Sequence, residues 1–278
     1  NRAYHLAMEE AMEHDLLIVP GSEITRSAPV GHNNAVFITD ANDLLHEDAK
    51  DAFTSAKKQQ AFVFWNHPAW YAQSPAGTPI LSDFQKERIK KGELHGIEVI
   101  NNVDYSEESL ALALENNLTI MGTSDVHGLI DWDYTQKGNH RPITLVFAKE
   151  TSIDELKKAL FAGRTVAVYN DLLVGKAEYL KPLLKACIEV VRAEYIGKTQ
   201  VLEVELKNIS SSDLLFENAM DFTFYDSSPV FEIPAGEAKI VKIKTLENLN
   251  NLNLQLLALG AYTAPKVHPL LEWNVVVE

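Results

Sequence analysis

Apolar runs of strand length alternate with helical repeats along the first part of the chain. Short, strongly apolar runs are typical of buried strands, whereas apolar residues that recur every third or fourth position predict helices. The sequence predicts strands at 16–23, 35–39, 61–66, 96–101, 119–124, 142–147 and 165–169. It predicts helices at 48–60, 80–91, 106–116 and 152–162, the last opening on a Ser152-x-x-Glu155 capping box. Alternation at this spacing predicts an α/β fold with a parallel sheet, open or closed.

The pattern changes near residue 170. A helix at 174–187 predicts a linker, and beyond it apolar and polar residues alternate strictly, so that Leu202, Val204 and Leu206 share one face. The same alternation recurs at 239–244 and 252–256, with turn residues in between. These features predict a small Ig-like β-sandwich. We therefore expect two domains, 1–175 and 176–278. The second shows no ligand cluster, so its expected role is structural or binding.

Side chains that bind metals stand at the ends of three apolar runs. The first run ends in Glu23, with His32 nine residues later, and the run at 61–66 ends in His67 before a proline. The run at 119–124 ends in Asp125 and His127, which alternation along a strand would place on one side, about 7 Å apart. Loops from parallel strands converge at the C-terminal face of a sheet. The five residues therefore predict one metal-binding cup.

Each of these residues also has a plainer explanation when it is taken alone. His32 and His67 fit surface or hydrogen-bonded histidines, and Asp125 and His127 fit a turn with a capping aspartate. The recurrence of one design at three strand ends favours the metal site. Glu98, inside an apolar strand, either orients a ligand histidine or is a strand-end charge.

Composition limits the functions that the chain can have. Its 278 residues are 46% hydrophobic, and no apolar run approaches about 18 residues, so we expect a soluble globular protein without a transmembrane helix. The net charge of −14 argues against long nucleic acid as a partner, since such binding relies on Lys and Arg. The single cysteine, Cys187, excludes an internal disulfide and a thiolate zinc site. The compartment, cytoplasmic or periplasmic, and the oligomeric state stay open.

Three motifs in order point to a family. Ser-Glu-Ile-Thr followed by Gly-His, then Trp-Asn-His-Pro, then Thr-Ser-Asp-Val-His occur within residues 1–170 and together resemble the polymerase and histidinol phosphatase (PHP) superfamily of metal-dependent phosphoesterases. The resemblance implies an irregular (β/α)7 TIM-like barrel with two or three divalent ions, for which Zn, Mn and Fe are all suitable. It implies that Glu23 bridges two metals, that His32 and His67 complete the shell of one, and that Asp125 and His127 bind the others.

One part of the family pattern does not occur in this sequence. The family opens with a His-x-His strand, a following Asp and a further His after the second strand. We therefore expect a segment before Asn1 that carries these ligands.

The ligands define the expected reaction. A carboxylate shared by two divalent ions holds them about 3.5–4 Å apart, where a bridging water loses a proton near neutral pH. We expect such a hydroxide to hydrolyse a phosphate ester on a small phosphorylated substrate, such as a nucleotide. Glu23, Asp125 and His127 are the predicted catalytic residues. Arg26 and Arg141 are predicted to hold the substrate phosphate, although each fits a surface arginine equally well.

Two other functions fit parts of the pattern. An amidohydrolase-like metal hydrolase also binds metal through His and Asp on a barrel, but it typically uses a carboxylated lysine at a strand end, and no Lys follows the apolar runs named above. The other is a non-catalytic PHP-like scaffold that acts through its β-sandwich as a binding module. No Gly-rich phosphate loop, Gly-x-Ser-x-Gly elbow or paired-cysteine motif occurs, which excludes the P-loop, serine hydrolase and zinc-finger classes.

Overall fold

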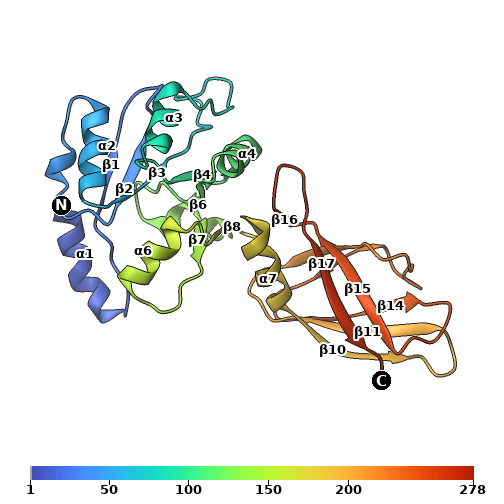
Figure 1. Ribbon diagram of the computed structural model, residues 1–278. Coiled ribbons are helices and arrows are strands. Elements are labelled where there is room, and N and C mark those ends of the chain that lie inside the picture. Colours follow the sequence, from blue (N-terminus) through green and yellow to red (C-terminus); the bar gives the residue numbers. More distant parts are fainter. Residues whose placement is uncertain (1) are drawn as a thin grey trace. The chain divides into compact units, whose positions relative to one another are not determined.

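The computed structural model describes residues 2–278, and the chain divides into two compact units. One unit ends at Tyr169, and the other runs from Asn170 to Glu278. The first is an α/β unit and the second consists mostly of β-strands (Figure 1). The domain division between residues 175 and 176 stays a prediction. No helix in residues 2–278 has the length and apolar character that crossing a bilayer requires.

A mixed sheet forms the centre of the first unit. Its strands are β1 (Gly21–Ile24), β2 (Asn33–Val36), β3 (Phe62–Trp65), β4 (Gly96–Asn101), β5 (Asp104–Tyr105) and β6 (Thr119–Thr123). β4 has β3 and β6 as parallel neighbours, whereas β1, β2 and β3 pair antiparallel. The prediction of a parallel sheet is therefore wrong for the first strands. Residues 25–32, which connect β1 to β2, are too few for the crossover of a dozen or more residues that parallel strands need.

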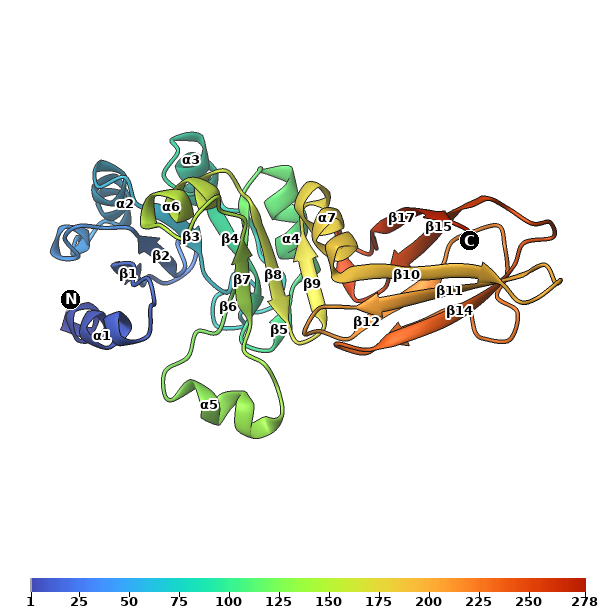
Figure 2. The same cartoon turned by 90° about the horizontal axis from the view of Figure 1, so that it is seen from below.

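Helices precede and connect these strands. They are α1 (Arg2–Glu13), α2 (Ala49–Lys58), α3 (Asp83–Lys90), α4 (Glu107–Glu115), α5 (Ile130–Asp133) and α6 (Ile153–Phe161), with 3-10 turns η1 (Asn42–Leu44) and η2 (Thr135–Lys137). Figure 2 shows α5 on a loop that projects from the sheet. At the start of α6, Ser152 accepts the Glu155 backbone N–H, but the Glu155 carboxylate pairs with Lys158. The predicted capping box is thus half formed.

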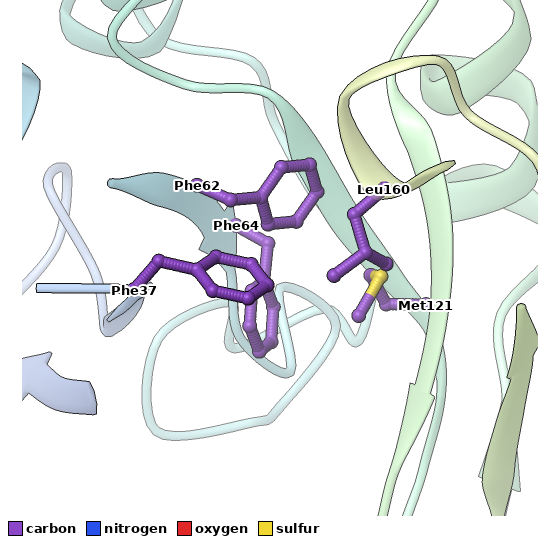
Figure 3. Close-up of a cluster of buried hydrophobic side chains, with 5 residues drawn as sticks. All are labelled: Phe37, Phe62, Phe64, Met121 and Leu160. Atoms are coloured by element: carbon purple, nitrogen blue, oxygen red, sulfur yellow. The ribbon is translucent and has the colours of Figure 1, made fainter. Parts of the chain in front are cut away.

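The apolar runs supply the core of the first unit. Phe37, Phe62, Phe64, Met121 and Leu160 form one buried cluster (Figure 3). All four residues of β3 are buried, as expected for a strand covered on both faces. After β6 the chain forms an antiparallel pair, β7 (Ile143–Val146) with β8 (Thr165–Tyr169).

The predicted strand at 16–23 is shorter in the structure. β1 begins only at Gly21. Leu16 and Leu17 are 62% and 44% exposed, and Pro20 has no N–H to donate to a ladder.

The second unit contains two antiparallel sheets. One has the order β10 (Ile188–Tyr195), β11 (Val201–Asn208), β14 (Ala238–Lys244), and the other β13 (Val230–Ile233), β12 (Leu214–Asn218), β15 (Asn251–Ala258), β17 (Leu270–Val276). Leu202, Val204 and Leu206 of β11 are buried, as the alternation predicts. Before these strands come β9 (Leu172–Gly175) and α7 (Ala177–Cys187), and β9 pairs in parallel with β16 (Ala261–Tyr262).

Candidate metal centre

The five predicted ligands lie at one edge of the first unit's sheet. Glu23 lies in β1 and His32 directly precedes β2, while His67 follows the end of β3 and Asp125 and His127 follow the end of β6. Because β2 runs antiparallel to β3, the start of β2 lies beside the end of β3. Because β4 is parallel to both β3 and β6, β6 ends at the same edge. The strand order alone thus brings the ligand positions together.

Four of the five side chains form a continuous series of contacts. Glu23 Oε1 lies 3.0 Å from His32 Nδ1, and Asp125 Oδ2 lies 3.9 Å from His67 Nε2. The His32 and His67 rings meet edge to face, with centroids 4.9 Å apart. The His67 side chain is 7% exposed and that of Asp125 is 37% exposed, so the carboxylate end of this pair faces solvent.

His127 turns toward its own loop. Its Nδ1 lies 2.7 Å from the backbone carbonyl oxygen of Asp125, so in a neutral ring Nδ1 carries the proton and Nε2 is the acceptor. The argument from strand alternation does not apply here, because β6 ends at Thr123 and Asp125 has a left-handed φ of 50°. A short polar side chain makes this conformation easier for aspartate than for most residues.

Glu98 holds the backbone of His67. Its Oε2 accepts the His67 backbone N–H at 2.6 Å and Asn101 Nδ2 at 3.0 Å, and its Oε1 accepts Thr123 Oγ1 at 2.5 Å. His67 needs this support because it has a φ of 29° and precedes Pro68, a combination that costs conformational energy. Of the two roles that the sequence left open, this hydrogen bond favours the orienting one. It acts through the main chain of the histidine.

Burial shifts the pKa values of Glu98 and His67. Glu98 is 2% exposed, and burial raises the pKa of its carboxyl to about 7, although hydrogen bonds from Thr123 and His67 lower that pKa. Burial lowers the pKa of the His67 imidazole below its usual value, and the Asp125 carboxylate opposes this shift. The neutral imidazole that burial favours is the form that binds a metal ion.

Gln73 and Trp70 support the two histidine rings. Gln73 Nε2 lies 3.5 Å from His67 Nδ1, while Gln73 Oε1 is buried and has no hydrogen-bond partner in the described part of the chain. Exchanging the amide oxygen and nitrogen turns Gln73 Oε1 toward His67 Nδ1, where it accepts a hydrogen bond from the Nδ1–H and leaves His67 Nε2 free as a ligand. Trp70 stands edge-on to His32 and His67, at 5.8 and 5.1 Å between ring centroids. Gln73 lies in an irregular segment, so the sequence gives no signal for it.

The two arginines predicted to bind phosphate lie in different environments. Arg26 follows β1, and its guanidinium donates to the backbone carbonyls of Thr25 and His46. Arg141 is exposed and lines a hollow with Tyr134 beyond η2. Their role in phosphate binding stays a prediction.

The donor chemistry of the centre fits divalent cations. Ligands at about 2.0–2.2 Å from a tetrahedral ion stand roughly 3.3–3.6 Å from each other, which is close to both carboxylate–imidazole distances. Across residues 2–278, however, no group of three or more His, Cys, Asp or Glu side chains is gathered where one ion could be held. The centre therefore consists of two carboxylate–imidazole pairs, Glu23 with His32 and Asp125 with His67, whose imidazole rings contact each other.

A cavity adjoins the centre and shares His67 and Glu98 with it. It has a volume of about 250 Å³. Its walls come from the segment that follows β3 and from β4, β5 and the start of α4.

The whole chain is similar to a solved structure. It is the crystal structure of a two-domain protein from Bacteroides vulgatus, described as containing a predicted PHP-like metal-dependent phosphoesterase. The match has a TM-score of 0.90 and 32% sequence identity, and covers 100% of this chain and 80% of that one.

The other comparisons concern the second unit or carry little weight. Residues 188–274 match a family described as an Ig-like domain. A CsuC–CsuE chaperone–tip adhesion subunit complex from Acinetobacter baumannii matches 32% of this chain and 53% of that chain, at 16% identity and a TM-score of 0.21, which is too low to support an argument. No curated protein matches the sequence.

Proposed function

The chain belongs to the PHP-like metal-dependent phosphoesterase family, and on that premise we propose that it hydrolyses phosphate esters with divalent metal ions bound at the candidate centre. The predicted fold class, a PHP-type α/β domain followed by an Ig-like β-sandwich, is confirmed by the same matches. The observation that carries the proposal is the contact between two carboxylate–imidazole pairs at the strand ends.

The residues of the centre would hold the ions and the substrate. Glu23, His32, His67, Asp125 and His127 are the proposed ligands, with Zn, Mn and Fe as the candidate metals. Bound divalent ions supply Lewis-acid polarisation of the phosphoryl group and lower the pKa of a water molecule. Glu98 holds the His67 backbone, and Gln73 contacts Nδ1 of His67, the ring nitrogen opposite the one that faces Asp125.

The remaining roles concern the substrate. We assign Glu23, Asp125 and His127 to the catalytic centre, and Arg26 and Arg141 to the substrate phosphate, which a planar guanidinium binds through two parallel hydrogen bonds. For Arg26 this requires that it leave the carbonyls of Thr25 and His46. The expected substrate is a small phosphorylated molecule.

Asp125→Asn tests the proposal in the full-length protein. The change keeps the shape of the side chain but removes the charge that balances a cation, so bound metal per chain should fall. Hydrolysis of p-nitrophenyl phosphate should drop more than about 100-fold, because loss of a partner that only orients a ligand already costs about 10–100-fold. The matched control is Asp83→Asn, an equal change at a fully exposed helix start. Equal losses in both variants, or none in Asp125→Asn, would contradict the assignment.

Metal analysis separates this function from the non-catalytic scaffold. The scaffold is favoured by one observation, the absence in residues 2–278 of a group of three acidic, histidine or cysteine ligands around one point. Full-length protein incubated with Zn, Mn or Fe should retain metal through gel filtration if the centre is catalytic. Protein that keeps no metal and hydrolyses no ester would support the scaffold instead.

A further inference from the structure

The cavity beside His67 has walls of an unusual composition for a protein that acts on anions. Three aromatic residues, Trp70, Tyr71 and Tyr105, line it together with the acidic residues Asp104 and Glu108. None of its lining residues is lysine or arginine. A second phosphate or a carboxylate would therefore meet negative charge without a counterion.

Two of the rings are held at the cavity wall although water reaches them. Trp70 is 49% exposed and Tyr71 is 74% exposed. Trp70 stands against the His67 ring, and Tyr71 lies on Gly77, where an added Cβ would come within 3.2 Å of the tyrosine Cε1. Gly77 thus leaves room for the ring to pack closely. Large exposed rings in fixed positions present their surfaces to a ligand.

Rings and carboxylates together recognise a positive charge. The face of an aromatic ring attracts an ammonium group, and cages of such rings are the usual sites for quaternary ammonium ligands. Size agrees with this chemistry. An apolar cavity of about 150 Å³ takes up benzene, so 250 Å³ accommodates a trimethylammonium group with a short alcohol arm.

We infer that this cavity binds the alcohol part of the substrate, and that this part carries an ammonium cation. The inference rests on the proposed function, with the phosphate at the carboxylate–imidazole pairs and the cation beyond His67. Water attacks phosphorus, the bond from phosphorus to the ester oxygen breaks, and that oxygen takes up a proton. The products are inorganic phosphate and a free amino alcohol.

Paired substrates test the charge preference. Phosphocholine and 3,3-dimethylbutyl phosphate have nearly the same shape but differ by one positive charge. We expect kcat/KM to be about tenfold higher for phosphocholine, in the range that one desolvated cation–ring contact provides. If p-nitrophenyl phosphate is hydrolysed while the two esters react equally, the proposed function stands and the inference fails.

Binding without turnover gives a second, independent measurement. Tetramethylammonium chloride, titrated into the full-length protein against sodium chloride of equal strength, should change tryptophan fluorescence and raise KM for phosphocholine. Tyr71→Ala and Asp104→Asn should weaken this binding about tenfold, whereas Tyr71→Phe, which keeps the ring, and Asp83→Asn, at an exposed residue outside the cavity lining, should not. Unchanged affinity in Tyr71→Ala and Asp104→Asn would overturn the inference even in a protein that hydrolyses no ester.

Discussion

At the residue scale, the carboxylate of Glu98 carries much of the support for the candidate centre. It accepts hydrogen bonds from the His67 backbone, Asn101 and Thr123, and it is buried. Removing the acceptor leaves buried donors unpaired, at about 1–3 kcal/mol each. Loss of the hydrogen bond to His67 should contribute much of this destabilisation, because the strained backbone of His67 depends on that bond.

Two substitutions of Glu98 should therefore differ in stability. Glu98→Ala should lower the free energy of unfolding by about 3 kcal/mol or more, because donors lose their partner and a void forms. Glu98→Gln keeps an oxygen for the His67 N–H and should cost less than half as much. Urea unfolding of both variants measures the difference. Equal destabilisation would show that the retained volume and single amide oxygen of Gln contribute nothing, and that the site needs the carboxylate itself.

Gly31 is a second residue on which the geometry of the centre depends. Its φ is 72°, and a Cβ there would lie 2.5 Å from Gln73 Oε1 and 2.8 Å from Trp65 Nε1. Gly31→Ala should thus cost stability and also push Gln73 away from His67. Gly138→Ala is the matched control, since Gly138 has a φ of 76° with nothing within 4 Å of an added Cβ.

The two alanine variants separate strain from displacement. Gly138→Ala should cost about 1–2 kcal/mol, the usual penalty for a left-handed L-residue. Gly31→Ala should cost more than that and should weaken metal binding as well. Urea unfolding and metal titration of both variants provide the check, and equal effects would mean that Gln73 does not position His67.

At the element scale, the sequence predicts positions well and directions poorly. An apolar run that ends in Glu, His or Asp predicts a strand with a candidate ligand at its end, because burial needs apolar side chains and chemistry needs polar ones at the exit. Strand direction depends on the length of connections, and so β1 and β2 form an antiparallel pair that periodicity alone does not reveal. Glu98 illustrates the remaining limit. Its partners come from the segment after β3 and from β4 and β6, and only the folded sheet brings them together.

His95, at the start of β4, should make the stability of this sheet depend on pH. Its Nδ1 accepts the Val63 backbone N–H, and its ring packs on Phe62 and Phe161. Burial lowers the pKa of His95 below 6.5, and the nearby charge of Lys57 lowers it further. Below pH 6.5 the unfolded chain therefore gains a proton that the folded protein resists. The contribution of the neutral ring is complete above this pH and is lost as pH falls toward the folded pKa.

His95→Asn tests this dependence. The amide oxygen takes the place of Nδ1 as acceptor but does not titrate. Unfolding free energies at pH 7.5 and 5.5 should show a larger loss on acidification for the wild type than for the variant. A parallel decline in the two proteins would mean that other groups cause the acid sensitivity.

At the scale of the whole molecule, the compact units and the predicted domains differ in where β9 belongs. The second unit begins at Asn170 and includes β9, whereas the predicted domain begins at residue 176 and excludes it. β9 pairs with β16, and the Leu173 backbone N–H donates to the Gly260 carbonyl. A chain that starts at residue 176 leaves β16 without this neighbour.

Two fragments should reveal the better boundary. Residues 170–278 should unfold cooperatively, because the two sheets have their own buried core. Residues 176–278 should be less stable by about 1 kcal/mol or more, the contribution of the lost backbone hydrogen bonds. Thermal unfolding of the fragments measures the difference, and equal stability would support a boundary at 175/176.

The proposed ligands and the residues that line the cavity are largely separate sets, and this separation bears on how such proteins diversify. Glu23, His32, Asp125 and His127 lie outside the set of residues that lines the cavity, and His67 is the proposed ligand that belongs to both sets. Asp104, Tyr105 and Glu108 can therefore mutate without a change of ligand, and Tyr71 can do so too. Gene duplicates could exchange these wall residues and acquire new substrates while inheriting the same reaction. On the proposed assignments, we expect selection on the ligands and selection on the wall residues to be largely uncoupled, with His67 as the position where both act.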